Sequence, residues 1–532
     1  MKTPFRRALT TMALLLATAL PATAGVIDDF RNSWAGKAIA LQNRLDTFTQ
    51  LGEMSMIGTH NSFNSDAYRS CDLNKGCRYQ DPQQKYSIYN QLRMGGRFLE
   101  IDAHWTTKME SLFDYPKRLL MCHNGGSGVC SINDKYLTEG LDEIRDWLNS
   151  GDSEGQILLL YIEDHSKGHH QELYEQVTDR IGPWVYASGS CRDIPATLTK
   201  SQILSSGKKV LVYGSKTCSS NSNWANLAFM TLGNITREWE DRTLVGTINT
   251  LWEDGAADHL NASEIRAALL SGTNIVALDD MSPSDGRLPA AVWSWSENEP
   301  NNNNGVQDCA AQTSSGRWDD RLCSNNLPFA CQNSSDSSWK VTLTAGSFSA
   351  GQARCQAEYG GNYNFRVPSN SVDNNKLSVA RAAAGFSDVW LNHDDQQTEG
   401  EWRINGQNVH NPGNLARTLS YAPGGLTLYK NQSIRTRTRL LSMQDDGNLA
   451  LYRIDYGIPI GPALWHANTD GTGAQRVEFQ TDGNLVIYPA SGGAKWDSNT
   501  NGKGKTLVLQ ADGNLVIYDG SNTAKWDTNS ND

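Results

Sequence analysis

The sequence predicts three folds in succession: a closed parallel α/β barrel over residues 25–291, an α+β domain over residues 292–405, and an all-β domain over residues 413–532. Three observations support this division. The first region alternates helical patterns with short β-rich runs, the composition shifts to Trp, Asn, Ser and Gly from about Val292, and a nine-residue motif repeats near the end. A chain of 532 residues is also too long for a single hydrophobic core.

The first 24 residues have the pattern of a secretory signal peptide. Lys2, Arg6 and Arg7 precede an apolar run over residues 12–20, and small residues lead to a cleavage point predicted after Ala24. Loss of these three positive charges takes the formal net charge from −11 to −14. An acidic mature chain argues against a nucleic-acid partner, and no later segment has the roughly 18 consecutive apolar residues of a membrane span. We therefore expect a secreted, extracellular protein with no transmembrane segment.

The cysteines predict disulfides, as expected in an exported protein. All ten lie after the predicted cleavage point, and they form no paired Cys-x-x-Cys set of the zinc type. Their spacing favours three pairs: Cys71–Cys77, Cys122–Cys130 and Cys191–Cys218. Sequence alone leaves the pairing of the other four open.

Strand-like runs in the first region end in ionisable side chains. The runs are residues 56–60, 98–102, 119–123 and 158–163, and they end at His60, Asp102, His123 and Glu163. Further strands are expected at residues 209–213 and 274–278, with amphipathic helices such as 137–148 and 262–270 between strands. This alternation is typical of a TIM-like barrel, in which the C-terminal ends of the strands carry the chemistry. We therefore expect the ionisable side chains to form one site.

Four motifs give that site a family resemblance. Residues 58–61 read Gly-Thr-His-Asn, 97–102 read Arg-Phe-Leu-Glu-Ile-Asp, 122–125 read Cys-His-Asn-Gly and 162–165 read Ile-Glu-Asp-His. In this order they resemble the catalytic X region of phosphatidylinositol-specific phospholipases C. The resemblance implies a catalytic set of His60, His123, Glu100, Glu163 and Arg97, in which His60 contacts the phosphoryl oxygens and His123 is the general acid. It leaves open whether Glu100 or Glu163 is the base.

The resemblance is to the calcium-dependent branch of that family. Calcium-dependent members carry Asn after the first histidine and acidic residues on the second and fourth strands. By this likeness Ca²⁺ is the cofactor, and Asn61, Glu100, Asp102 and Glu163 are its oxygen ligands. Such an ion stabilises negative charge that builds on a phosphodiester.

One departure from the family bears on the substrate. Members that act on phosphorylated inositides carry lysines where this chain has Tyr213 and Ser215, and only Lys216 follows. The expected substrate is therefore plain phosphatidylinositol or a glycosylated inositol lipid at a membrane surface. A barrel that keeps these residues without activity is the alternative.

The middle region resembles a C-type-lectin-like domain with its two halves in reversed order. Residues 293–331 look like the second half, with Glu-Pro-Asn at 299–301 and Trp-Asp-Asp at 318–320, and residues 339–402 look like the first half. A circular permutation explains this order, and two separate half-domains are the alternative. The likeness implies the disulfides Cys309–Cys323 and Cys331–Cys355. It also implies a second metal site, made by Glu299, Asn301, Asp319 and Asp320. The alternative is that the tryptophans of this region only form its core and that the Asn-rich loop is only a solvated loop.

The last region repeats Gln-x-Asp-Gly-Asn-Leu three times, and Trp465, Trp496 and Trp526 recur at matched positions as a shared core. The repeats resemble the bulb-type mannose-binding lectins, which form a β-prism. The likeness implies two complete sugar sites and a weaker one, which lacks the valine. These are Gln480, Asp482, Asn484, Val486 and Tyr488; Gln510, Asp512, Asn514, Val516 and Tyr518; and, weaker, Gln444, Asp446, Asn448 and Tyr452. A prism that keeps the motif for folding alone is the alternative.

Together these likenesses predict a secreted, calcium-dependent phosphatidylinositol phospholipase C that mannose-type glycans hold near its substrate. The rival predictions are a secreted lectin, adhesin or toxin with an inactive barrel, and a glycerophosphodiester phosphodiesterase.

Overall fold

The computed structural model describes residues 22–72, 76–79, 82–123, 130–214, 219–240, 260–284, 286–403, 418–430, 432–436, 439–444, 446–455, 458–459, 462–510 and 512–531. Most of the predicted signal peptide lies outside these ranges. Within them, no helix is long and apolar enough to cross a membrane.

The first region is built on a curled sheet of seven strands. Six run parallel in the order β7–β6–β4–β1–β9–β8, and β5 pairs antiparallel with β4. Their bounds are β1 (Met56–Thr59), β4 (Phe98–Thr107), β5 (Lys117–Met121), β6 (Leu158–His165), β7 (Val210–Tyr213), β8 (Arg237–Trp239) and β9 (Ile275–Leu278). The parallel sheet is as predicted, but it is a half-barrel in the described residues, and closure between β7 and β8 stays a prediction. The strand before His123 also differs from the expected parallel barrel strand, because it belongs to a hairpin.

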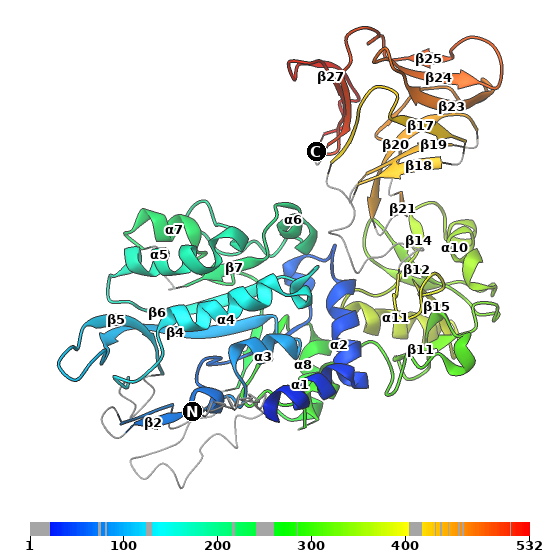
Figure 1. The fold of residues 1–532 in the computed structure, drawn as a ribbon. Coiled ribbons are helices and arrows are strands. Elements are labelled where there is room, and N and C mark those ends of the chain that lie inside the picture. Colours follow the sequence, from blue (N-terminus) through cyan, green and yellow to red (C-terminus); the bar gives the residue numbers. More distant parts are fainter. Residues whose placement is uncertain are drawn as a thin grey trace, which may run out of the picture.

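Helices surround this sheet (Figure 1). Their bounds are α1 (Ala22–Asn32), α2 (Trp34–Leu45), α3 (Ile88–Arg93), α4 (Leu137–Asn149), α5 (His170–Ile181), α6 (Lys200–Ser205), α7 (Ser222–Leu227), α8 (Ala262–Ser271) and α9 (Arg287–Ala291). In α4 the predicted apolar face is buried, with Leu141, Ile144 and Trp147 at 0% exposure. In α8 the Asn261 side chain accepts from the first-turn amides, and Gly272 ends the helix at φ 96°. Sequence therefore placed the long helices well.

The first and middle regions share one hydrophobic core. It joins Ile39 of α2 and Val276 of β9 to Trp293 and Trp318 of the middle region. The buried Gln42 side chain bridges the predicted boundary, since it donates to the carbonyl of Ala291 (3.1 Å) and accepts from the amide of Trp293 (3.2 Å). The composition shift near Val292 is therefore not a boundary in packing.

The middle region holds two three-stranded antiparallel sheets, β11–β10–β15 and β13–β12–β14. Its elements are β10 (Cys309–Gln312), β11 (Trp318–Arg321), β12 (Ala330–Asn333), β13 (Trp339–Val341), β14 (Tyr363–Phe365), β15 (Val389–Asp394), α10 (Gly351–Tyr359) and α11 (Ser371–Ala383). β10 pairs with β15, so segments from both predicted half-domains form one sheet. The C-type-lectin-like assignment itself stays a prediction.

The disulfide predictions are confirmed wherever the structure describes both partners. The bonds are Cys71–Cys77, between β2 (Ser70–Asp72) and β3 (Gly76–Arg78), and Cys122–Cys130, Cys309–Cys323 and Cys331–Cys355. Cys191 is also disulfide-bonded, and its predicted partner Cys218 lies outside the described residues.

The last region consists of three antiparallel sheets that share one core. The sheets are β16–β26–β27–β28, β17–β23–β24–β25 and β18–β19–β20–β21 with β22 beside β20. The strands are β16 (Leu419–Tyr421), β17 (Leu426–Tyr429), β18 (Gln432–Arg435), β19 (Arg439–Met443), β20 (Leu449–Asp455), β21 (Ile458–Pro459), β22 (Trp465–His466), β23 (Ala474–Phe479), β24 (Leu485–Pro489), β25 (Trp496–Asp497), β26 (Thr506–Leu509), β27 (Leu515–Tyr518) and β28 (Ala524–Asp527). Trp465, Trp496 and Trp526 meet with ring centroids 5.4–5.6 Å apart. The predicted shared tryptophan core is confirmed.

Candidate functional site

His60 lies directly after β1, and two side chains fix its ring. Its Nδ1 lies 3.2 Å from Oδ1 of Asp279, and its Nε2 lies 3.2 Å from Nδ2 of Asn61. Because an amide nitrogen can only donate and a carboxylate can only accept, Nδ1 carries the proton and Nε2 accepts. The Asp279 side chain is 0% exposed, so this pair is shielded from water.

Asp279 follows β9 and is itself held by a buried ion pair. Its amide donates to Oε2 of Glu240 (2.5 Å), and Nη1 of Arg287 donates to both oxygens of that carboxylate (2.8 Å each). Burial raises the pKa of Glu240 to about 7, against the opposing charge of Arg287. Sequence reasoning missed Asp279, although its place after the strand at residues 275–278 was an available signal.

Three carboxylates gather beside His60. Glu100 and Asp102 come from β4 and Glu163 from β6, where Asp102 is in register with Glu163. One ligand atom of each lies within 4.8 Å of the others. Burial, and then the charges of Glu163 and Glu100, raise the pKa of Asp102 well above its usual range. The crowded site therefore disfavours full ionisation unless a cation is present.

Two buried oxygens at this cluster have no hydrogen-bond partner among the described residues. They are Oδ1 of Asn61 and Oδ1 of Asp102, in residues only 2% and 1% exposed. Buried acceptors in folded proteins are normally satisfied. Unpaired amide and carboxylate oxygens, next to two further carboxylates, form the hard oxygen set that suits Ca²⁺. The residues present therefore fit the expected ion.

Two histidines complete this edge of the sheet. His123 is half-buried after β5, and the amide of Cys122 donates to the carbonyl of Asp102 (3.3 Å), which brings the end of the hairpin beside the carboxylates. Nε2 of His165 lies 3.2 Å from Oε1 of Glu163. The hydrogen bond from His165 lowers the pKa of Glu163, and the charge of His123 acts in the same direction.

A cavity of about 500 Å³ opens beside these groups. His60, Glu100 and Glu163 line it together with Tyr161, Tyr213, Arg237 and Trp239. The Arg237 guanidinium lies 3.8 Å from the Trp239 ring centroid and 3.5 Å from Oε2 of Glu100. Sequence reasoning missed Arg237 and Trp239, which lie on the short edge strand β8. Ser215 and Lys216 lie outside the described residues.

Arg97 is not brought to this cavity. It precedes β4, five residues before Asp102, and its guanidinium donates to the carbonyls of Leu92 and Gly96 and packs over Trp147. Burial lowers its pKa to about 10. The catalytic assignment of Arg97 therefore has no support from geometry.

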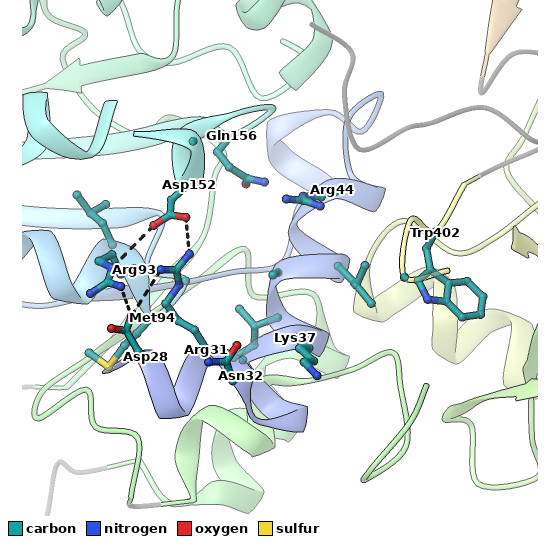
Figure 2. Close-up of a pocket in the computed structure, with 18 of the residues that line it drawn as sticks. Asp28, Arg31, Asn32, Lys37, Arg44, Arg93, Met94, Asp152, Gln156 and Trp402 are labelled. Atoms are coloured by element: carbon teal, nitrogen blue, oxygen red, sulfur yellow. Dashed lines mark hydrogen bonds and ion pairs between the residues drawn. The ribbon is translucent and has the colours of Figure 1, made fainter. Parts of the chain in front are cut away.

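Arg97 instead lines a different cavity, of about 610 Å³, between α2 and the middle region. Figure 2 shows that Arg31 and Arg93 face Asp28 and Asp152 there, and these four side chains form ion pairs. His60, Glu100 and Glu163 do not line this cavity.

The middle region brings together two acidic clusters. The sequence-predicted cluster joins Glu299, Asp319 and Asp320, with the amide of Asn301 donating to Oδ1 of Asp320 (3.2 Å). Burial, and then a hydrogen bond with Asp320, raise the pKa of Glu299 to about 8.

The second cluster, which sequence reasoning missed, joins Asp308, Asp395 and Glu399. Asp395 is 3% exposed, its Oδ1 has no partner in the described part of the chain, and burial raises its pKa to about 7. In each cluster, one carboxylate oxygen of every member lies within 4.8 Å of the others.

The last region presents the predicted motif three times with the same geometry. The glutamine amide donates to the tyrosine hydroxyl in each repeat, at 3.0 Å (Gln444–Tyr452), 2.8 Å (Gln480–Tyr488) and 2.6 Å (Gln510–Tyr518). In each repeat the aspartate side chain accepts from the backbone amide of the asparagine two residues later, in Asp446–Asn448, Asp482–Asn484 and Asp512–Asn514. Val486 and Val516 are only 3% and 2% exposed, so little of either side chain is free to meet a sugar.

The α/β region and the C-terminal region are similar to two different groups of known proteins. Residues 15–232 match the family model described as the Rv2075c PI-PLC-like domain. The uncharacterized protein Rv2075c of Mycobacterium tuberculosis is 25% identical over 412 residues, which cover 69% of this chain and 81% of that protein. This match extends beyond the segment of the family model.

The C-terminal region is similar to mannose-binding lectins. A mannose-specific lectin of Aloe arborescens is 40% identical over 74 residues (14% of this chain and 62% of the lectin), and the B-type lectin plumieribetin of Scorpaena plumieri is 35% identical over 82 residues (14% and 66%). A solved mannose-binding lectin of Gastrodia elata is 38% identical, with a TM-score of 0.19, and the match covers 22% of this chain and all of that one.

Proposed function

We propose that the half-barrel is a calcium-dependent phospholipase C that cleaves phosphatidylinositol, or a glycosylated inositol lipid, to diacylglycerol and a cyclic inositol phosphate. The pair of unsatisfied buried oxygens on Asn61 and Asp102, next to the histidine held by Asp279, carries this proposal. A bound cation would satisfy both oxygens, as buried acceptors normally are.

The residues of the site fit the steps of that reaction. The inositol hydroxyl loses its proton to Glu100 or Glu163 and attacks phosphorus, and the bond to the diacylglycerol oxygen breaks. His60, protonated on Nε2 as well when the phosphodiester replaces Asn61 as its partner, stabilises the phosphoryl oxygens, and His123 returns a proton to the leaving oxygen. Asn61, Glu100, Asp102 and Glu163 would hold the calcium ion, which supplies positive charge against the phosphodiester.

The cavity wall supports a cyclic, anionic headgroup as substrate. Arg237 supplies positive charge, and Trp239, which is 52% exposed, offers a ring face on which an inositol ring can stack. Both lie on β8, which β9 separates from β1, the strand that His60 follows.

The direct test incubates the purified full chain with phosphatidylinositol vesicles, with calcium or with a chelator, and measures cyclic inositol phosphate. We expect product only with calcium, loss of product in His60→Ala, and normal product in His466→Ala, a matched change at an exposed histidine. Equal product from His60→Ala, or none from the wild type with calcium, would leave a lectin with an inactive barrel as the better description.

The C-terminal prism is proposed to bind mannose-type glycans of the target surface, and the whole chain to act outside the cell. The Gln–Tyr pairs and exposed aspartates of the three repeats support this proposal. We expect retention of the protein on immobilised mannose, lost in the double variant Asp482→Asn/Asp512→Asn but kept in Asp470→Asn. Equal retention of all three proteins would show that the motif serves the fold alone.

A further inference from the structure

The β4–β5 hairpin extends well past the carboxylate cluster and reaches the edge of the molecule (Figure 1). Its strands pair from Ala103 with Met121 to Thr107 with Lys117. Beyond them, Ser111 and Asp114 close a tight turn with backbone hydrogen bonds of 3.2 and 3.4 Å. The hairpin is therefore an ordered ribbon.

The tip of this ribbon is apolar and faces solvent. Leu112 and Phe113, the two central residues of the turn, are 60% and 91% exposed, and Tyr115 is 48% exposed. Turn centres normally carry Gly, Asn, Asp, Ser or Pro, because those residues suit the backbone. Leu and Phe serve no such purpose, and their exposure is unfavourable in water. Phe113 is the most exposed large apolar side chain in the described part of the chain.

A band of balanced charge lies behind the tip. Glu110 is acidic, Lys117 and Arg118 are basic, and Nε of Arg118 pairs with Oε1 of Glu110 at 3.0 Å. A further acidic residue, Asp114, lies in the turn itself, between Phe113 and Tyr115. A net charge near zero excludes electrostatic attraction as the main driving force. An apolar tip, an aromatic hydroxyl behind it and then charged groups match the layers of a lipid interface.

We propose that the tip formed by Leu112, Phe113 and Tyr115 inserts into the interfacial layer of a phospholipid bilayer. This proposal rests on the proposed function, because the substrate named there lies in a bilayer. The link is covalent and short: Glu100 and Asp102 lie in the first half of β4, which ends at Thr107, five residues before Leu112 of the tip. Insertion would therefore hold the carboxylate edge of the sheet toward the lipid headgroups.

The test uses the full chain and vesicles of phosphatidylcholine alone, which offer no sugar and no net charge. We expect the wild type to cosediment with them, equally at low and high salt. The double variant Leu112→Ser/Phe113→Ser should bind at least about 10-fold more weakly, because both side chains lose most of the apolar surface that would enter the lipid. The matched double variant Leu343→Ser/Val379→Ser removes apolar side chains of 74% and 64% exposure elsewhere and should bind normally.

A second measurement separates this proposal from the proposed reaction. Turnover of phosphatidylinositol in vesicles should fall in the tip variant, whereas turnover of a water-soluble inositol phosphodiester without acyl chains should not change. Unchanged vesicle binding by the tip variant would overturn the insertion proposal and leave the reaction standing. If the tip variant bound vesicles normally but lost a self-association that the wild type shows, this would also overturn the insertion proposal and would assign the tip to contact with a second copy of the chain. Wild type that binds vesicles but cleaves neither substrate would refute the reaction alone.

Discussion

Replacement of Asp102 by Asn should have opposite effects with and without calcium. Asp102 takes part in two of the three carboxylate pairs, whose ligand atoms lie within 4.8 Å of one another. At an effective dielectric constant near 20, a fully ionised pair at that separation costs about 3 kcal/mol. Partial exposure of Glu163, whose side chain is 41% exposed, and protonation of Asp102 both reduce this cost. We therefore expect the calcium-free variant to be more stable than the wild type by about 1–2 kcal/mol.

The assay is thermal unfolding of the full chain, measured by calorimetry. Calcium at 100 times its dissociation constant should stabilise the wild type by about 2.7 kcal/mol, and Asp102→Asn should lose most of that response. Because the pKa of Asp102 is raised in the folded state, the calcium-free wild type should lose stability as the pH rises through that pKa. The variant should lack this pH dependence. A calcium-free variant less stable than the wild type, with a normal calcium response, would refute the assignment of Asp102 as a ligand.

Three other changes test the surrounding structure. Asp279→Asn should lower the turnover number about 100-fold or more and alter its pH profile, because the negative charge that orients the His60 ring and stabilises its protonated form is lost. An unchanged pH profile in steady-state kinetics would contradict this. Lys200→Met should lower the free energy of unfolding by about 3 kcal/mol, because it leaves the buried carboxylate of Asp46 without its partner at 2.7 Å. If denaturant titration gave a free energy of unfolding within about 1 kcal/mol of the wild-type value, the ion pair would not have the expected effect on stability. Burial lowers the pKa of His393 to about 3, whereas in the unfolded chain a histidine is protonated below about pH 6.5. The free energy of unfolding should therefore be about 2 kcal/mol lower at pH 5 than at neutral pH because of this residue. Unfolding followed by tryptophan fluorescence should show that His393→Asn removes this loss.

The sequence predicted the parts of the site that end an apolar run, although β4 and β6 continue past Asp102 and Glu163 to Thr107 and His165. His60, Asp102 and Glu163 follow apolar runs short enough to be buried strands, and parallel strands bring their C-terminal ends to one edge. The same rule applied to residues 275–278 would have found Asp279, which lacks a motif of its own. Arg97 shows the limit of motif reasoning, since a residue that precedes a strand lies at the opposite edge.

Contacts between distant segments could not be predicted. Arg237 and Trp239 stand on a strand of only three residues, too short to show a period. Asp308 and Asp395 are far apart in sequence, and only the pairing of β10 with β15 brings them close. The closed barrel was predicted from alternation of strands and helices, which sets the order of elements but not how far a sheet curls.

The Gln42 bridge has a consequence for how the protein can be divided. Its side chain contacts the backbone on both sides of residue 292, within a core that continues from α2 into the middle region. A truncated protein that ends at Ala291 would therefore leave the apolar face of α2 in water and remove the donors to the side-chain oxygen of Gln42. The first two regions should unfold in a single transition, and a different module could replace the middle one only if α2 were redesigned with it.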